Sequence, residues 1–544
     1  MDQRTRRGLH GLHANGDRAL VRMPAVSSQR RRIVSAATLI LAVFVLSRIL
    51  GYARDLVIAN TFGTSQHLDD YQVAFRVPDL LFNLLLAGAI SSAFIPVLSE
   101  RLALGEASRA REIAERVLNS GILILTAGAA LLWLGAPLFV NLTAYGYGPA
   151  DHDLIVKLTR ILLLQPILLG AGGLVVGILT AHQRFLGQSP AALVYNLSII
   201  VAAAFFAPRV GVEALAWGVV VGAILFLAVQ VPSLWRTGWR PHAAFGWSDP
   251  GVRKVGRLMF PIALGLAAAQ INLFVDTTLA TSLPHGRVAA LKYADTIAQV
   301  PLGTFSSALA YVLFPFLSRD AALNAIDRLR DRLLLSLRLN LFTLVPASFA
   351  LAVFGLPIVA ILFQRGRFDR GSTRETAVAL AFFSIGIMFQ AATALLVRGF
   401  YALQDVMTPL KVSALVIAVN LLTNVFLVRL LAQGGLALGT SIAATLNALL
   451  LGSLLLRRLG NPRLGEVGRS AARAVAGSIP MVGAAGAVYL AIAGFSTGSS
   501  LRHVVAGTAA ILAGGAVYLL VERLLGSSEL TVLLSVLRRE GRGT

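Results

Sequence analysis

The chain has 544 residues, of which 56% are hydrophobic and only 14% are charged, whereas soluble domains carry roughly 25% charged residues. This composition excludes an ordinary soluble globular protein, and apolar runs long enough to span a bilayer recur from end to end. The net charge is +22 and there is no cysteine, which excludes disulfides and thiolate metal sites. Because the basic residues gather in short loops between apolar runs, they indicate membrane topology rather than a nucleic-acid partner.

The first 32 residues carry eight arginines against two aspartates, and we expect them to form a disordered cytoplasmic tail near anionic lipid. Arginine-rich loops recur on the tail's side of the predicted spans, so both termini are predicted to be cytoplasmic. One basic loop, FQRGRFDRGSTR at 363–374, falls on the opposite side. A single late loop rarely sets orientation, so the predicted topology stands.

An all-α polytopic membrane protein of about fourteen transmembrane helices is predicted from the apolar runs. The predicted spans are 35–58, 72–98, 114–140, 155–180, 188–207, 212–235, 255–281, 289–316, 333–361, 375–402, 409–430, 434–456, 472–493 and 502–525.

Segments of the first half of the chain resemble segments about 220 residues later. The matched pairs are RVPDLL with QVPLGT, IPVLSE with FPFLSR, AHQRFLGQSP with ALQDVMTP, and GVEALAWG with GGLALGTS. Each predicted repeat holds six spans, an even number, so both halves have the same orientation in the membrane. Parallel repeats of this kind form two lobes around a central cavity and alternate access by rocking. The predicted divisions are a tail at 1–32, an N-lobe at 33–240, a C-lobe at 241–460, two further helices at 461–530 and a second cytoplasmic tail at 531–544.

Several ionised residues lie inside predicted spans, where each costs at least ~2.5 kcal/mol at the bilayer centre, so they normally face a bundle interior or a wet cavity. Arg48 and Asp55 are two helical turns apart and can pair on one helix face, and Arg76 and Asp79 can pair three residues apart. Ion pairs that hold a lobe together are one interpretation of both pairs. Arg54 lies on another face, and its guanidinium fork suits phosphate oxygens. Further charges in or near later spans are Asp276, Lys292, Asp295 and Arg398, of which Arg398 can instead snorkel to the interface.

A second group of polar residues lies in the later spans. Asn420 and Asn424 are one turn apart on the eleventh predicted span, and Thr440 begins the twelfth. With Asp276 they offer one carboxylate and several neutral oxygens, which are ligands for a hard cation such as Na⁺. Hydrogen bonding between helices explains the same spacing equally well.

These motifs together resemble one known family. The chain is similar to the MurJ (MviN) family of bacterial lipid II flippases, within the superfamily that includes multidrug and oligosaccharide exporters. The segments that carry the resemblance are SRILGYARD, VAFRVPDLL, AFIPVLSE, ALAWGVVVG, YADTIAQVPLG, LFQRGRF and FYALQDVMTPLK. The likeness extends over about residues 35–525 and includes the helix count and the six-plus-six repeat.

The resemblance implies a transporter rather than an enzyme, which moves undecaprenyl-diphosphate-linked peptidoglycan precursor (lipid II) across the bacterial inner membrane. It implies that cavity arginines bind the diphosphate, that the last two helices form a groove for the lipid tail, and that proteins of cell-wall synthesis are candidate partners. Motif positions shared with the family are Arg48, Arg54, Asp55 and Asp69. The positions that would bind sodium, the candidate coupling ion, are Asp276, Asn420, Asn424 and Thr440, where Asn424 replaces a usually acidic ligand.

The chain departs from the family pattern where further cations are expected. Phe82 and Asn83 replace an arginine pair, Ala87 replaces a glutamate, and Thr296 replaces a cavity arginine. The candidates to replace the missing cations are Arg76, Lys292 and Arg398. Two alternatives to lipid II transport therefore stay open, a flippase for another polyprenyl-diphosphate-linked glycan and a non-transporting scaffold on the same fold. A membrane-embedded transferase is disfavoured, because no cluster of carboxylates for a catalytic metal is evident.

Overall fold

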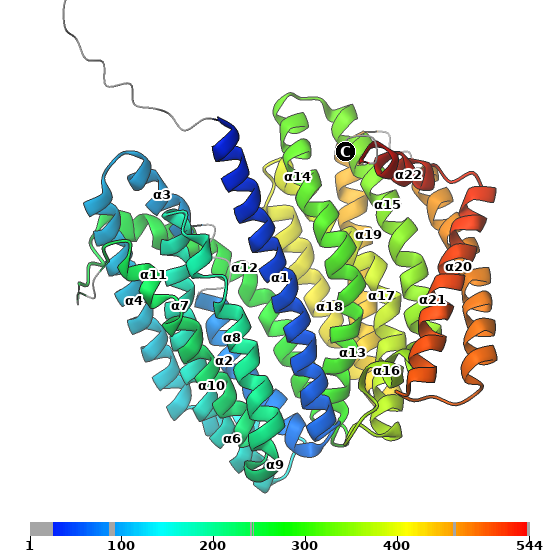
Figure 1. Cartoon of the computed structure of the whole chain (residues 1–544), viewed down its shortest axis with the longest axis horizontal. Coiled ribbons are helices and arrows are strands. Elements are labelled where there is room, and N and C mark those ends of the chain that lie inside the picture. Colours follow the sequence, from blue (N-terminus) through cyan, green and yellow to red (C-terminus); the bar gives the residue numbers. More distant parts are fainter. Residues whose placement is uncertain (1–25, 86–92, 240–241, 243, 461–463, 541–544) are drawn as a thin grey trace, which may run out of the picture.

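The computed structural model describes residues 26–85, 93–239, 242, 244–460 and 464–540. Within these ranges the secondary structure is helical, without β-strands, and the helices form two groups that diverge toward the end bearing the C-terminus (Figure 1). We use the name N-lobe for helices α1–α11 and C-lobe for helices α12–α19, and a helical pair with a short terminal helix follows. The fold class predicted from the sequence is confirmed.

The N-lobe consists of long helices joined by short ones. Its elements are α1 (Val26–Phe62), α2 (Gln66–Leu85), α3 (Ile95–Ala103), α4 (Ala107–Leu134), α5 (Ala136–Thr143), α6 (Pro149–Leu162), α7 (Leu164–Ala181), η2 (Phe185–Gly187), α8 (Ala191–Val201), the π-helical turn η3 (Ala202–Phe206), α9 (Ala207–Val210), α10 (Glu213–Ala228) and α11 (Val231–Trp235).

The C-lobe and the terminal helices likewise consist of long helices joined by short ones. Their elements are α12 (Pro250–Ala280), α13 (Arg287–Pro301), the π-helical turn η4 (Leu302–Ser306), α14 (Ser307–Ala322), α15 (Ile326–Val353), α16 (Gly355–Phe363), α17 (Arg370–Ala402), α18 (Met407–Leu431), α19 (Gln433–Arg458), α20 (Leu464–Ala493), α21 (Leu501–Leu524) and α22 (Ser528–Glu540).

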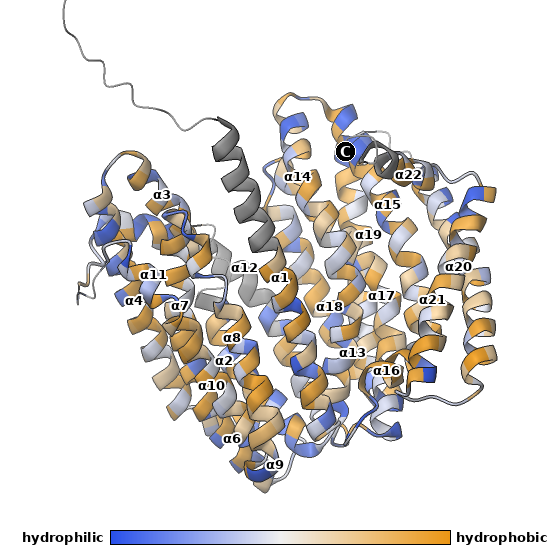
Figure 2. Ribbon diagram, viewed as in Figure 1, coloured by the Kyte–Doolittle hydropathy of each residue, from blue (hydrophilic) through white to orange (hydrophobic). Residues whose placement is uncertain are grey.

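Eleven helical segments in the described ranges are long and apolar enough to cross a bilayer. Hydrophobic residues run along outer helices such as α4, α10 and α21 (Figure 2). The other three predicted spans fall on α1, α2 and α12, which carry the charged motif residues and are not among the eleven. The count of fourteen therefore stays a prediction, as do the predicted lobe boundaries.

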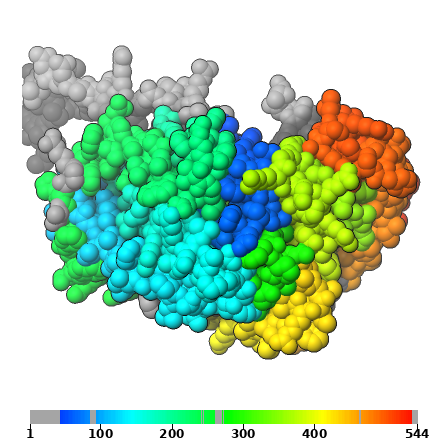
Figure 3. Space-filling view, turned by 90° about the horizontal axis from the view of Figure 1, so that it is seen from below, coloured from blue at the N-terminus to red at the C-terminus, as the bar shows by residue number. Residues whose placement is uncertain are grey.

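The two lobes share one buried core at the end opposite the C-terminus. There, Phe62 and Tyr71 of the N-lobe belong to the same buried cluster as Tyr293, Phe363 and Phe368 of the C-lobe. Toward the other end there are two separate clusters, one in the N-lobe, which also includes Val255 near the start of α12, and one in the C-lobe. Figure 3, viewed from the shared end, shows the surfaces of the two lobes meeting. The molecule is therefore closed at this end, and the lobes separate toward the other.

Backbone and side-chain contacts hold the lobes together at this end, and we name them the lobe junction. Arg367 N–H donates to the Asn60 carbonyl at 2.9 Å, and the Thr64 hydroxyl donates to Ser372 Oγ at 2.8 Å. Gly366 has a φ of +54° and lies so close to the Asn60 carbonyl that a Cβ atom would collide with it. The basic segment LFQRGRF thus contains a glycine that lets the two backbones meet.

Candidate functional site

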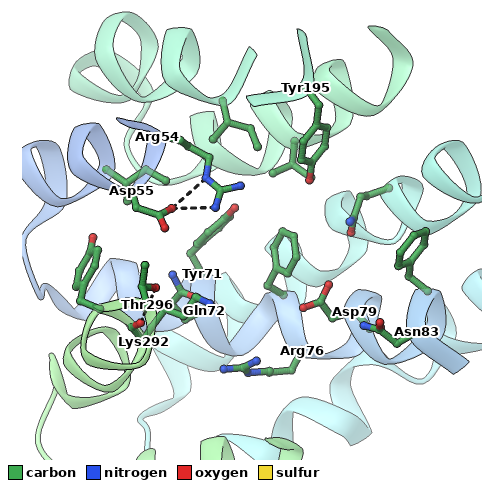
Figure 4. A pocket seen from close by; sticks show the side chains of 17 residues that line it. Arg54, Asp55, Tyr71, Gln72, Arg76, Asp79, Asn83, Tyr195, Lys292 and Thr296 are labelled. Carbon is green, nitrogen blue, oxygen red and sulfur yellow. Dashed lines mark hydrogen bonds and ion pairs between the residues drawn. The ribbon is translucent and has the colours of Figure 1, made fainter. Parts of the chain in front are cut away.

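A pocket of about 340 Å³ lies between α1, α2, α7, α8 and α10 of the N-lobe and α13 of the C-lobe (Figure 4). It contains both cations and carboxylates. The charged lining residues are Arg54, Asp55, Arg76, Asp79 and Lys292, which together carry one net positive charge. The pocket joins charges from both lobes, because Lys292 comes from α13 and the other four from α1 and α2.

Arg54 is fixed at the wall of this pocket by two partners. Its Nε and Nη2 donate to Asp55 Oδ1 at 3.0 and 2.9 Å, and its Nη1 donates to Asn196 Oδ1 on α8 at 3.3 Å. The side chain keeps 28% of its surface exposed. Because guanidinium has five N–H donors, this arrangement leaves donors free for an anion in the pocket.

The predicted pairing of Arg48 with Asp55 is wrong. Asp55 pairs with its chain neighbour Arg54, whose long side chain bends back along the helix. Arg48 lies two turns away, with its guanidinium 5.9 Å from the Tyr52 ring centroid and close to Gly303 of η4, where a Cβ atom would be 2.7 Å from Nη2. Helical spacing placed Arg48 and Asp55 on one face, but the guanidinium of Arg54 is nearer to the Asp55 carboxylate than that of Arg48.

Arg76 and Asp79 do not form the predicted ion pair either. Both line the pocket, yet no contact within 4.0 Å joins their charged groups in the described ranges, and Figure 4 shows these groups apart. The buried Nε of Arg76 has no hydrogen-bond partner there. A spacing of three residues allows a pair but does not compel one when each group can face a polar pocket instead. Arg76 therefore keeps its donors available.

The residues that replace the cations expected by resemblance also line this pocket. Phe82, Asn83 and Thr296 are all part of its wall, and Ala87 lies outside the described residues. Lys292 is one helical turn before Thr296 on α13, and the Thr296 hydroxyl donates to the Lys292 carbonyl at 2.9 Å. A lysine on the pocket face of α13 thus stands one turn from the position where an arginine was expected.

Asp69 lies at the lobe junction and not in the pocket. It is completely buried, and its carboxylate accepts the N–H groups of Gly286 at 2.5 Å and Ala289 at 2.7 Å, as well as the Tyr147 hydroxyl at 3.2 Å. It therefore caps the N-terminus of α13 from the N-lobe, where the helix dipole favours a negative charge. Its position indicates a role in closing the two lobes rather than direct contact with a ligand in the pocket.

Arg398 is also absent from the pocket lining. It lies on α17, and its guanidinium is 6.0 Å from the ring centroid of Phe314 on α14. Of the six residues predicted to bind substrate, the structure brings Arg54, Asp55 and Arg76 together, whereas Arg48, Asp69 and Arg398 lie elsewhere.

Three of the four predicted cation ligands meet between α12 and α18. Asn424 Nδ2 donates to Asp276 Oδ1 at 2.6 Å and to Asn420 Oδ1 at 3.0 Å. The buried Asn424 Oδ1 has no hydrogen-bond partner within the described part of the chain. The Thr440 hydroxyl donates to the Leu436 carbonyl of its own helix at 3.0 Å. The Asp276 carboxylate and the two amide oxygens, of which that of Asn424 is unpaired, are a donor set that suits a hard cation.

An apolar groove of about 720 Å³ lies between α15, α16, α20 and α21. Its walls are made of hydrophobic and small residues, among them Phe342, Met481 and Ile511. Residues 461–530 were expected to contribute such a groove, and α20 and α21 are the two helices of that segment.

Sequence reasoning did not identify several polar residues of the pocket. Gln165, Tyr71 and Tyr195 line it, and Asn196 bonds to Arg54. A usable signal was present, since Gln165 and Asn196 are carboxamide residues in largely apolar helices. Such residues in a membrane span need a polar partner.

Known proteins resemble this chain over most of its length. The model of the family described as Lipid II flippase MurJ matches residues 58–506. A lipid II flippase MurJ of Burkholderia cenocepacia is 34% identical, over 75% of this chain and 80% of the relative. A probable lipid II flippase MurJ of Vibrio cholerae is 30% identical, over 77% of this chain and 82% of the relative.

Solved structures support the same fold. The chain matches a structure described as lipid II flippase MurJ in an inward closed conformation with a TM-score of 0.74, at 24% identity and over 90% of this chain and 98% of that one. It also matches an inward-facing multidrug transporter of the MATE family with a TM-score of 0.65, at 14% identity and over 75% of this chain and 94% of the other. The span of the family match and the level of identity together lead to one conclusion: the chain belongs to the MurJ family of lipid II flippases.

Proposed function

We propose that this protein is a flippase that moves lipid II across the bacterial membrane by alternating access. The observation that carries the proposal is the pocket between the lobes, where cations of both lobes converge in a molecule closed at one end. Its family consists of transporters rather than enzymes, and its helices make it a multi-pass membrane protein. With both termini in the cytoplasm, as the loop charges favour, the lobes would separate toward the cytoplasm and close toward the outside.

The diphosphate of the substrate would bind to Arg54, Arg76 and Lys292. Arg54 and Arg76 offer donors that the described protein atoms leave unused, and an arginine fork matches phosphate oxygens. Lys292 adds a point charge from the opposite lobe. An anion that touches both lobes can follow their relative motion, which is what alternating access requires. The polyprenyl tail would lie in the apolar groove beside α20 and α21.

The decisive experiment is complementation in a bacterial host whose own lipid II flippase can be depleted. We expect the chain to sustain growth and Arg54→Ala to fail, because that variant loses the guanidinium held in the pocket by Asp55 and Asn196. Arg209→Ala is the matched control, since Arg209 lies outside the pocket on the short helix α9. Growth supported by Arg54→Ala at equal membrane abundance would contradict the phosphate-binding role.

A second cargo is favoured by one specific observation, the presence of Phe82 and Thr296 in the pocket wall. If the chain inserts in the membrane but does not sustain growth, a flippase for another polyprenyl-diphosphate-linked glycan becomes the better assignment. If variants that lack Arg54 or Asp276 show no change in any phenotype, the result would instead indicate a non-transporting scaffold.

Sodium is the coupling ion that we propose for the site at Asp276, Asn420 and Asn424. The three side chains converge there, and an unpaired buried amide oxygen supports the assignment. In vesicles with an imposed Na⁺ gradient, we expect Asp276→Asn to lose the stimulation of transport by Na⁺ because the one carboxylate of the site is gone. An unchanged response to Na⁺ would exclude this site, and replacement of Na⁺ by K⁺ in the parent protein provides the ionic-strength control.

A further inference from the structure

One buried carboxylate at the lobe junction takes no part in the pocket. Asp70 follows Asp69 on α2 and is 0% exposed, yet neither of its carboxylate oxygens has a hydrogen-bond donor in the described ranges. Its one basic neighbour within 4.0 Å there is His67, whose Nδ1 is 3.7 Å from Asp70 Oδ2, too far for a hydrogen bond. A buried anion without donors or an opposite charge costs several kcal/mol, so the ionised form of Asp70 is poorly stabilised here.

The groups around Asp70 leave no donor for it. On α6, Asp151 accepts the Gln66 side-chain amide and the Gly148 N–H, the latter at 3.3 Å, and its Oδ2 is 3.8 Å from His285 Nε2. The charged and titratable groups around this cluster include His67 and Asp69 on α2, Tyr147 before α6, Asp151 on α6, His285 before α13 and Arg287 on α13. The Tyr147 hydroxyl already donates its hydrogen bond to Asp69, and Arg287 forms an ion pair with Glu375. Asp151 and Asp69 are near enough to act electrostatically on Asp70, so these two carboxylates increase the cost of a charge on it.

The C-lobe covers this cluster. Asp69 accepts hydrogen bonds from the first N–H groups of α13. His285, in the turn just before α13, faces Asp151 and packs against Tyr147 with tilted rings whose centroids are 4.7 Å apart. Separation of the lobes would move the turn with His285 and the N-terminus of α13 away from the N-lobe together. Water would then reach the carboxylates of Asp69, Asp70 and Asp151. Water can solvate an ionised Asp70, whereas the closed junction cannot.

We propose that Asp70 is a proton-binding site, which holds a proton when the lobe junction is closed and releases it to water when the junction opens. The protonated carboxyl is neutral, so burial beside Asp69 and Asp151 costs little. On opening, the O–H bond of the Asp70 carboxyl breaks, the proton goes to water, and the carboxylate keeps the electron pair. This inference concerns lobe motion and is independent of which lipid-linked substrate is carried.

The direction of the pH dependence follows from the site. An exposed aspartate ionises near pH 4, and the closed junction keeps Asp70 protonated above that value. The closed junction is therefore favoured at low pH and is lost as the pH rises through the range where the buried carboxyl gives up its proton. One proton changes the ratio of closed to open molecules by at most about tenfold per pH unit.

The chain contains no cysteine, so a single introduced thiol can report on the junction. Ser372→Cys places it at a buried position that contacts Thr64, and Phe495→Cys provides a reference thiol at a site that is 95% exposed. The measurement is the rate of labelling by a water-soluble maleimide in detergent between pH 6 and pH 8.5, as a ratio to the reference. We expect the ratio to rise several-fold with pH in the protein with Asp70 and to stay flat with Asp70→Asn. A flat ratio with Asp70, or an equal rise in both proteins, overturns the proposal.

Three further variants separate Asp70 from its neighbours. His67→Gln removes the basic neighbour of Asp70 and should keep the rise. Loss of the rise in that variant would assign it to His67 and overturn the proposal. Asp153→Asn alters an exposed carboxylate on α6 and should change nothing. If Asp70→Asn does not fold, Asp151→Asn replaces it: the removal of a neighbouring negative charge should move the rise to lower pH, and an unmoved profile counts against Asp70.

Discussion

At the scale of single residues, the pocket depends on which charges remain unpaired. Arg54 uses part of its guanidinium to bind Asp55 and Asn196. These hydrogen bonds fix the side chain without occupying all of its N–H donors. Arg76 has a buried Nε without a partner among the described residues. Arg54 is thus ordered by the protein before an anion arrives, which lowers the entropy lost on binding. Among the described residues, Lys292 supplies the only cation that the C-lobe contributes to the lining of this pocket.

We predict that Lys292→Met weakens substrate binding by roughly 10- to 100-fold, the equivalent of one hydrogen bond to a charged group at about 1.5–3 kcal/mol. Methionine keeps much of the length of the side chain and removes its charge. The apparent affinity for lipid II in a vesicle transport assay is the measurement. Lys157→Met is the control, because Lys157 is 59% exposed and pairs with Glu213 outside this pocket. Equal effects of the two substitutions would argue against a specific contact.

At the scale of elements, charged residues anchor the connections between helices. Asp249 caps α12 by accepting the N–H groups of Gly251 and Val252, and it binds Arg109 and Arg116 of α4. The segment that joins the two lobes is therefore tied to the N-lobe where α12 begins. Asp369 similarly caps α17 through the Ser372 N–H, directly after the basic segment that meets Asn60. The basic loop that fell on the unexpected side of the topology thus contributes to the lobe junction.

The turn between α17 and α18 provides a pH test of one such anchor. The Thr408 hydroxyl and N–H donate to the Asp405 carboxylate at 2.7 and 2.9 Å, and together with Arg458 they lower the pKa of Asp405 to about 2. A carboxylate with a lowered pKa stabilises the fold above pH ~4, and this stabilisation is lost as the pH falls toward 2. Asp405→Asn should therefore lower the Tm by no more than a few degrees at pH 7, because the site is near the surface.

The difference in Tm between the parent protein and Asp405→Asn should shrink as the pH falls from 4 toward 2. The Asp405 carboxylate of the parent protein is then protonated and, like asparagine, uncharged. Thermal unfolding of both proteins in detergent at matched pH gives the comparison. Asp153→Asn, at an exposed carboxylate, should show no such trend. A Tm difference that is independent of pH would mean that the charge of Asp405 contributes nothing to the anchor.

At the scale of the whole molecule, the two lobes share a core at one end and have separate cores toward the other. The shared end is held by backbone hydrogen bonds, by Asp69 at the start of α13, and by glycines at points of backbone contact. Such contacts require close approach, so they break together when the lobes move apart. Alternating access predicts that this end opens during each transport cycle.

A cross-link across the lobe junction should therefore stop transport. The hydroxyls of Thr64 and Ser372 are 2.8 Å apart, so Thr64→Cys combined with Ser372→Cys is expected to form a disulfide on oxidation in a chain that has no other cysteine. We expect the oxidised double variant to lose flipping in vesicles and to recover it with reductant, while each single variant is unaffected by oxidant. Full activity of the cross-linked form would exclude opening at this end.

The sequence by itself determined the helical membrane class and the family, and it predicted that Arg54 faces a cavity, because apolar runs, loop charges and motif spacing are properties of the chain. Only the tertiary structure decided the partners of the charged residues. Helical spacing predicted Arg48 with Asp55, but the nearest guanidinium belonged to Arg54. Spacing also could not locate Asp69, whose backbone donors lie about 220 residues away at the start of α13. A side chain's partner depends on distances between helices that are remote in sequence, and those distances are fixed by packing rather than by local periodicity.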